Sequence, residues 1–297
     1  MQVKICTIIL SYNEEKHIER AIESALKFSH KILVCDSFSD DRTLTICAKF
    51  QNVTVLQHKW INYAKQFVFA QSNVPSDCNY IFRLDADEYV CDELANSISR
   101  IDSDVIKGYY VNRHMNFRSK RMRYGGLFPV RVLRLFDKDF GHCENRWMDE
   151  HIVLEGPISY LPGELTDDNL NTVSWWITKH NVYSNREAID IYLSRNGLEL
   201  ETIKISKDLT QASVKRFLKE KIYNKLPIGF RALLYFIYRY FLRLGFLDGL
   251  VGLQFHFLQG LWYRFLVDTK FSELEWYIRT HACSLEKAVK KLYNIDL

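Results

Sequence analysis

The stretch that decides the fold is Val3-Lys4-Ile5-Cys6-Thr7-Ile8-Ile9-Leu10, an apolar run that leads into Ser11-Tyr12-Asn13-Glu14. A continuous apolar run of this length predicts a buried strand. Asn13 favours a helix start, because its side chain can cap the free N–H groups of a first turn, and Glu14 and Glu15 suit the positive end of a helix dipole. The segment therefore predicts a strand followed at once by a helix.

Three further apolar runs predict strands, at Lys31–Cys35, Val53–Gln57 and Tyr80–Leu84. Helical patterns lie between them, at Arg42–Phe50 and from about Ile61 to Gln71. Strands that alternate with helices predict a mostly parallel, doubly wound α/β sheet.

The pattern changes further along the chain. Lys107–Asn116 and Pro129–Phe136 predict strands with few helical signals between them, so we expect antiparallel additions to the sheet. From Ser184 onward the pattern is helical. We therefore predict an α/β domain over residues 1–183 and a helical region over residues 184–297.

The composition sets the size of the core and the compartment. With 297 residues and 47% hydrophobic residues, the chain can form one large domain with an appendage. Its seven cysteines are scattered and form no C-x-x-C pair, which indicates buried free thiols rather than a zinc site or a disulfide framework. The N-terminus shows no signal peptide. We expect the protein on the cytosolic side.

A basic, aromatic stretch suggests a partner. Lys215–Arg243 holds eight Lys or Arg residues against the single acid Glu220. Such a stretch suits an anionic membrane surface or a nucleic acid. Its Phe and Leu content fits lipid better than a groove that follows phosphates, so we expect a membrane surface and no nucleic acid.

Residues 228–267 predict two amphipathic helices in the membrane interface. In the window Leu244–Tyr263 one side of a helical wheel holds a set of mostly polar residues, which a spanning helix would not need: Asp248, Gly252, His256, Gln259 and Tyr263. Arg231, Arg239 and Arg243 also share one arc and would form a basic face toward lipid headgroups. The alternative is that these helices pack on the catalytic domain.

Acidic residues follow two of the predicted strands. Asp36 ends the second strand, and Asp85-Ala86-Asp87 ends the fourth. Ligands of open α/β sheets bind beyond the carboxyl ends of the strands, and paired carboxylates there suit Mg²⁺ or Mn²⁺ holding a diphosphate. Two other D-x-D triplets, at 102–104 and 137–139, lack this context and are typical of turns.

Three motifs in order resemble the family-2 inverting glycosyltransferases, which have the Rossmann-like GT-A fold. They are Ser11-Tyr12-Asn13-Glu14, the stretch Asp36-Ser37-Phe38-Ser39-Asp40-Asp41-Arg42-Thr43, and Asp85-Ala86-Asp87. Residues 60–66 and 84–88 resemble the lipopolysaccharide-core subgroup. Residues 179–184 and 245–249 resemble relatives in surface-polysaccharide assembly.

The resemblance implies roles for named residues. Asp87 would be the principal ligand of Mg²⁺ or Mn²⁺, and Asp85 would lie near the metal, the ribose and the diphosphate. The implied nucleotide-sugar contacts are Ser11, Tyr12, Asn13, Glu14, Asp36, Ser39, Lys65 and Asp85.

The catalytic base is expected in Trp147-Met148-Asp149-Glu150-His151. Many family members carry an E-D pair here, whereas this pair is reversed, so either acid could be the base. We favour Glu150 over Asp149, because the corresponding subgroup segment ends in H-E. His151 and His180 could each complete the metal shell.

Together these features predict an inverting glycosyltransferase. It would move a sugar from a nucleotide sugar, expected to be a UDP-sugar, to a saccharide or lipid-linked acceptor in bacterial lipopolysaccharide or surface-polysaccharide synthesis. We expect it to be attached peripherally to the inner face of the cell membrane. A nucleotidyltransferase would need a Gly-rich basic loop after the first strand, but residues 11–15 are acidic and lack glycine. A non-catalytic membrane adaptor would have no need of Asp36, Asp85 and Asp87.

Overall fold

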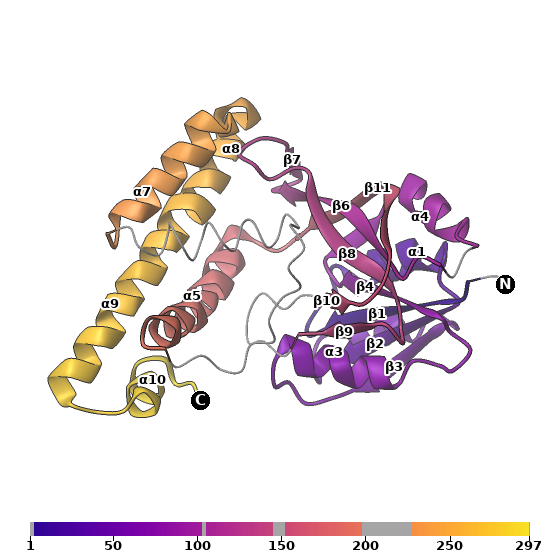
Figure 1. Cartoon of the computed structure of the whole chain (residues 1–297), viewed down its shortest axis with the longest axis horizontal. Coiled ribbons are helices and arrows are strands. Elements are labelled where there is room, and N and C mark those ends of the chain that lie inside the picture. Colours follow the sequence, from indigo (N-terminus) through magenta and orange to yellow (C-terminus); the bar gives the residue numbers. More distant parts are fainter. Residues whose placement is uncertain (1–2, 103–104, 145–151, 198–226, 297) are drawn as a thin grey trace. The chain divides into compact units, whose positions relative to one another are not determined.

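The structure of the chain is a computed structural model that describes residues 3–102, 105–144, 152–197 and 227–296 (Figure 1). It divides into two compact units, of which the first comprises residues 1–123 and 127–170 and the second residues 124–126 and 171–297. The division follows Leu170 rather than residue 183, because the helix α5 (Val173–Arg195) begins there and packs on later helices.

The first unit contains the four predicted parallel strands. They are β1 (Ile5–Ser11), β2 (Lys31–Asp36), β3 (Val53–Gln57) and β4 (Tyr80–Asp85). β1 pairs in parallel with β2 on one side and with β4 on the other, and β3 pairs with β2. The order β3-β2-β1-β4 reverses the direction of winding at β1. Ligands bind at such a switch point in open α/β sheets.

The sheet continues through strands that confirm the predicted antiparallel additions. They are β5 (Glu88–Val90), β6 (Gly108–Phe117), β7 (Lys120–Met122), β8 (Val130–Asp137) and β11 (Ile158–Asp168). β8 is antiparallel to β4 and β6, while β11 runs parallel to β6 and antiparallel to β5. A separate ladder joins β9 (Gly141–Cys143) and β10 (Ile152–Leu154). This order brings the end of β11 beside the segment that follows β4.

Helices enclose β1 within two hydrophobic cores. They are α1 (Ile18–Leu26), α2 (Thr43–Cys47), α3 (Tyr63–Ser72) and α4 (Asp92–Ser99). Ile5 and Ile9 of β1 join a core with α1, α2 and α4, whereas Cys6 and Ile8 join a second core with α3. Because β1 is buried on both faces, its sequence is a continuous apolar run rather than an alternating one.

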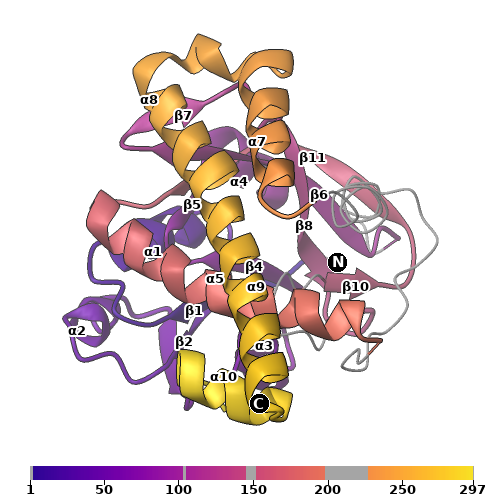
Figure 2. The same ribbon diagram turned by 90° about the vertical axis from the view of Figure 1, so that its left-hand side faces the viewer.

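The second unit is helical, as predicted. Its elements after α5 are α7 (Phe230–Ile237), the π-helix η2 (Tyr238–Leu242), the 3₁₀-helix η3 (Gly245–Asp248), α8 (Gly249–Phe255), the π-helix η4 (His256–Trp262), α9 (Tyr263–His281) and α10 (Leu285–Tyr293). α5 packs on α9 through Ala188, Ile191 and Phe271. Figures 1 and 2 both show α7 beside the helical run from α8 into α9. We call residues 230–262 the hairpin.

Candidate active site

Three strand ends bring predicted site residues to one edge of the sheet. In the parallel register Ser11, at the end of β1, lies opposite Asp36, at the end of β2. On the other side of β1, Leu10 lies opposite Asp85, at the end of β4. The segment after β1 therefore lies between the two acidic strand ends, at the switch point of the sheet.

Asp36 organises the loop that follows β2. Its side chain is fully buried, and its Oδ1 accepts the Ser11 hydroxyl at 2.9 Å and the Ser39 hydroxyl at 2.5 Å. Its Oδ2 accepts the Ser39 N–H at 2.8 Å. These bonds fix the loop against the end of β1. The predicted contact of Asp36 with the base and ribose stays a prediction.

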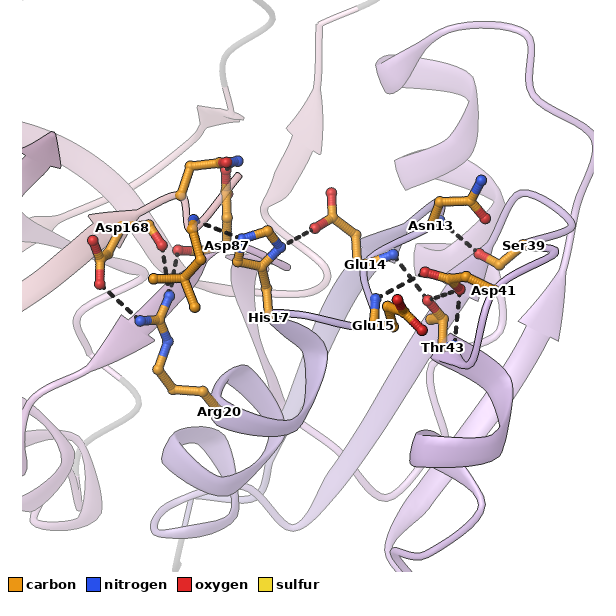
Figure 3. A network of polar contacts seen from close by, with 12 residues as sticks. Asn13, Glu14, Glu15, His17, Arg20, Ser39, Asp41, Thr43, Asp87 and Asp168 are labelled. Carbon is orange, nitrogen blue, oxygen red and sulfur yellow. Dashed lines mark hydrogen bonds and ion pairs between the residues drawn. The ribbon is translucent and has the colours of Figure 1, made fainter. Parts of the chain in front are cut away.

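Asn13 does not cap a helix, which corrects the expectation from its residue type. It has a φ of 55°, in the left-handed region that Asn tolerates, and α1 begins only at Ile18. Asn13 instead joins two loops: its N–H donates to the Ser39 hydroxyl at 2.9 Å, and its Oδ1 accepts the Asp40 N–H at 3.0 Å. Figure 3 shows Asn13 beside Ser39.

Glu14 is held through both its backbone and its side chain (Figure 3). Its N–H donates to the Thr43 hydroxyl at 2.9 Å, and its Oε2 lies 2.6 Å from Nδ1 of the buried His17. Nε2 of His17 accepts the Leu170 N–H at 2.8 Å. Because Nε2 accepts, the ring carries its proton on Nδ1 and donates it to Glu14.

Asp85 lies among arginines. Its Oδ2 is 2.9 Å from Nη2 of Arg134, and its Oδ1 is 3.6 Å from Nε of Arg83. Burial alone would raise the pKa of Asp85, but the charges of Arg134 and Arg83 outweigh it and hold the pKa well below its ordinary value. Arg134 also binds the buried Glu88 at 2.6 Å, and Glu88 accepts the Asp85 N–H at 3.0 Å. The Asp85 carboxylate is therefore ionised, and the guanidinium groups of Arg134 and Arg83 already balance its negative charge.

Asp87 is tied to the end of β11. The Asn169 amide donates to its Oδ2 at 2.9 Å, and its main-chain carbonyl accepts the Asp168 N–H at 3.0 Å. Arg20 of α1 binds the Asp168 carboxylate at 2.8 Å and the Asp168 carbonyl at 2.7 Å (Figure 3). Sequence reasoning missed Arg20, Asp168 and Asn169, because no local pattern links segments so far apart in the chain.

Asp87 fits a divalent cation better than Asp85 does. Asp87 is half-buried, and among the described residues no hydrogen bond reaches its Oδ1, whereas Asp85 faces two guanidinium groups. Burial and then the Asp87 charge raise the pKa of Asp167 to about 8, which marks an excess of acid at this edge. No group of three or more His, Cys, Asp or Glu within the described ranges could hold a metal. A cation here would take further ligands from phosphate oxygens, as Mg²⁺ commonly does.

Two predicted nucleotide contacts are exposed at the same loops. The Tyr12 side chain is 57% exposed. Lys65 is exposed in the first turn of α3, where its N–H donates to the capping Asn62 at 2.8 Å. Both side chains are accessible to a ligand.

The predicted catalytic pair, Asp149 and Glu150, and the neighbouring His151 lie outside the described residues. His180, the other histidine considered for a metal, lies on α5 in the second unit. Its Nδ1–H donates to the Trp176 carbonyl at 2.9 Å, and its ring stacks on that of Trp176.

Comparison with known proteins finds a family similarity in the first half of the chain. Residues 6–150 match the family described as Glycosyl transferase family 2. An uncharacterized glycosyltransferase of Rickettsia prowazekii is 26% identical over 254 residues, which cover 81% of this chain and 85% of that protein. An uncharacterized glycosyltransferase from Rickettsia conorii is 27% identical over 258 residues, which cover 81% of this chain and 88% of that protein. The structure of S. aureus TarS 1-349 in complex with UDP-GlcNAc aligns with 94% of this chain and 92% of that chain, at a TM-score of 0.44 and 15% identity. Over residues 6–150 the chain is therefore similar to the glycosyl transferases of family 2.

Proposed function

We propose that this chain is an inverting glycosyltransferase that uses a nucleotide sugar, with a UDP-sugar as the expected donor. The observation that carries the proposal is the convergence of Ser11, Asp36 and Asp85–Asp87 at the switch edge of a domain that is similar to the glycosyl transferases of family 2. The proposed acceptor is a hydroxyl of a saccharide or a lipid-linked saccharide.

We place the reaction in bacterial lipopolysaccharide or surface-polysaccharide synthesis, at the inner face of the cell membrane. Two kinds of observation support this. The stretches 179–184 and 245–249 resemble proteins of surface-polysaccharide assembly. The hairpin also exposes many large apolar side chains.

In the proposed reaction the acceptor oxygen forms a bond to the anomeric carbon while the bond from that carbon to the diphosphate oxygen breaks. Glu150 takes the acceptor proton. Asp87 would hold a Mg²⁺ or Mn²⁺ ion, which would supply positive charge to the leaving diphosphate. Asn169 and Asp168 hold the Asp87 turn in place before substrate arrives, which limits the reorganisation needed during transfer.

Nucleoside diphosphate release from a panel of nucleotide sugars tests this proposal, with the purified full chain and added Mg²⁺ or Mn²⁺. One UDP-sugar should be turned over, EDTA should silence the enzyme, and Asp87→Asn should abolish release. The matched control is Asp102→Asn, which changes an exposed acid of another D-x-D triplet and should leave release unchanged.

Each contrary outcome has a distinct meaning. Full activity in EDTA would remove the metal from the proposal. Pyrophosphate release from a nucleoside triphosphate would show a nucleotidyltransferase instead. If the protein neither turned over nor bound any nucleotide sugar, that result would favour a non-catalytic membrane adaptor.

A further inference from the structure

The hairpin has its charges inside and its apolar side chains outside. Its four formally charged residues are Arg231, Arg239, Arg243 and Asp248. Arg231, Arg239 and Asp248 are buried, and Arg243 alone of the four is exposed. The prediction that Arg231 and Arg239 form an outward basic face is therefore wrong, because both side chains are buried against other parts of the second unit.

The buried arginines are hydrogen-bonded within the unit. Nε of Arg231 donates to the two carboxylate oxygens of Asp268 at 2.8 and 2.9 Å. Arg239 donates from Nη1 to the Gln259 side chain at 2.8 Å and from Nε to the Gly125 carbonyl at 3.2 Å. Buried guanidinium groups are stable only with such partners, so the inward direction of these side chains is part of the fold.

The first arm of the hairpin presents an apolar stripe to the surroundings. Phe230, Leu233, Ile237 and Phe241 are all exposed. Their spacing of three and four residues places them on one face of a helix.

The returning arm presents a second stripe. Leu250, Leu253 and Phe257 are exposed at the same helical spacing, and Leu250 is 70% exposed. Phe246, in η3 just before α8, is exposed as well. At the turn between the arms Leu242 is 71% exposed. Exposed apolar side chains gathered along both arms mark an interaction site rather than an ordinary solvated face.

Both ends of the hairpin are held by polar segments of the same unit. At the open end Asp268 accepts the Gly229 N–H at 2.8 Å in addition to the Arg231 bonds. At the turn Gly125 donates its N–H to the Arg243 carbonyl at 2.8 Å, and Tyr124 donates its N–H to Asp248 at 3.0 Å. These bonds fix both ends of the hairpin to the rest of the second unit.

Helix length leads to the same arrangement. No single helix among the described residues has the length and hydropathy to cross a membrane. Phe230–Leu242 and Gly245–His281 reach that length and hydropathy only when taken together, and they are bent by 71° relative to each other. At about 1.5 Å per residue, α7 and η2 together reach about 20 Å, which is short of a hydrocarbon core of about 30 Å. The arms also return side by side, since α7 packs on η4.

We propose that the hairpin embeds its two apolar stripes in the acyl chains of one leaflet and lies along the plane of the membrane. The occupant is bilayer hydrocarbon, because the charge pattern is complementary to a medium without charge. Arg231, Arg239 and Asp248 are buried and hydrogen-bonded, and the two outward stripes contain no charged residue. Arg243, the exposed charge, lies at the turn and outside both stripes. This attachment is apolar in origin, and it does not depend on the transfer reaction.

Flotation of the full chain with neutral phosphatidylcholine vesicles tests the proposal. The wild type should float with these vesicles and stay bound in 1 M NaCl, because apolar burial is not screened by salt. Leu242→Lys and Leu250→Lys should each lower the partition coefficient by about tenfold or more. Val182→Lys, a change at an exposed apolar residue of α5, is the control and should bind as the wild type does.

Four outcomes would overturn the proposal. The first is vesicle binding that needs anionic lipid or is lost in 1 M NaCl. The second is a fall in the partition coefficient of Val182→Lys as large as that of Leu242→Lys or Leu250→Lys. The third is a lipid-free dimer, seen by light scattering, that Leu250→Lys dissociates, since a second copy would then cover the stripes. The fourth is protection of α10 from protease added outside the vesicles, because a one-leaflet hairpin leaves α10 on the side of addition.

Discussion

Nε2 of His17 accepts the backbone N–H of Leu170 at 2.8 Å, which joins the start of α1 to the segment that follows β11. The same segment holds Asp87 through Asn169. On its other side His17 binds Glu14 in the loop after β1. The loop after β1, the D-x-D turn and the end of β11 therefore form one hydrogen-bonded assembly (Figure 3).

Replacing His17 tests whether this assembly supports the fold. His17→Phe keeps a ring of similar size but leaves Glu14 and the Leu170 N–H without their partner. We expect a loss of about 1–3 kcal/mol in the free energy of unfolding, measured by urea denaturation, and weaker donor binding. His30→Phe changes an exposed histidine and should stay within about 0.5 kcal/mol of the wild type. Equal stability of the two variants would contradict the structural role of His17.

Asn169 is expected to position Asp87 for the cation. Asn169→Ala removes the amide that donates to Asp87, so that carboxylate is no longer held in one orientation. We expect the Mg²⁺ or Mn²⁺ concentration for half-maximal transfer to rise by about tenfold, as for other partners of metal ligands. Asn73→Ala, at an exposed amide after α3, should leave the metal titration unchanged. A purely structural role of Asn169 would lower stability without moving the metal titration.

The choice of base between Asp149 and Glu150 is a prediction from sequence. Adjacent side chains in an extended segment point to opposite faces, so one of the two acids should face the donor. Glu150→Gln should lose several orders of magnitude in transfer and still bind the nucleotide sugar, because the amide keeps the shape without the basicity. Asp149→Asn should lose less. Single-turnover rates and donor titration of both variants decide the assignment, and the reverse ranking would give the role to Asp149.

The Arg231–Asp268 pair is expected to hold the open end of the hairpin. Arg231→Met leaves the buried Asp268 carboxylate without its cation and should cost about 3–5 kcal/mol in unfolding free energy. The double variant Arg231→Met/Asp268→Leu removes both charges and should recover most of that loss. Thermal melting in detergent measures both. A double variant less stable than Arg231→Met would show that the pair is not an isolated charge interaction.

His180 should make the second unit sensitive to acid. Burial lowers its pKa to about 4 from an ordinary value of 6.5, so the native state holds the ring neutral where the unfolded chain binds a proton. The stability is complete above pH 6.5 and is lost as the pH falls toward 4. The total loss should be on the order of 1–2 kcal/mol, allowing for partial exposure. Urea denaturation from pH 7.5 to 4 measures it, and His180→Phe should flatten this part of the profile. An unchanged slope in that variant would assign the acid sensitivity elsewhere.

The strands of the first unit and the carboxylates at their ends could be predicted from the amino-acid sequence alone. Val3–Leu10 and Tyr80–Leu84 are mostly apolar because both faces of these strands are covered, and such stretches are visible locally; the exceptions are Lys4, Thr7 and Arg83. Asp36 and Asp85 follow their strands directly, so the parallel arrangement was enough to bring them to one edge.

The hydrogen-bond and ion-pair partners of these residues could not be predicted from sequence, because they come from segments that are brought together only by folding. Asn13 has the residue type of a helix cap, yet it bonds to the loop after β2, because that loop supplies Ser39 and Asp40 as closer partners. Arg134 reaches Asp85 from β8, and Asn169 reaches Asp87 from the position that follows β11; both strands join the sheet only on folding.

The hairpin shows the same limit for helices. Helical periodicity predicted that Arg231 and Arg239 share a face, but it could not tell whether that face meets solvent or another helix. The arginine face is buried because Asp268 and Gln259 accept hydrogen bonds from the two guanidinium groups, which makes their burial stable. The apolar stripes therefore lie on the outside of the hairpin.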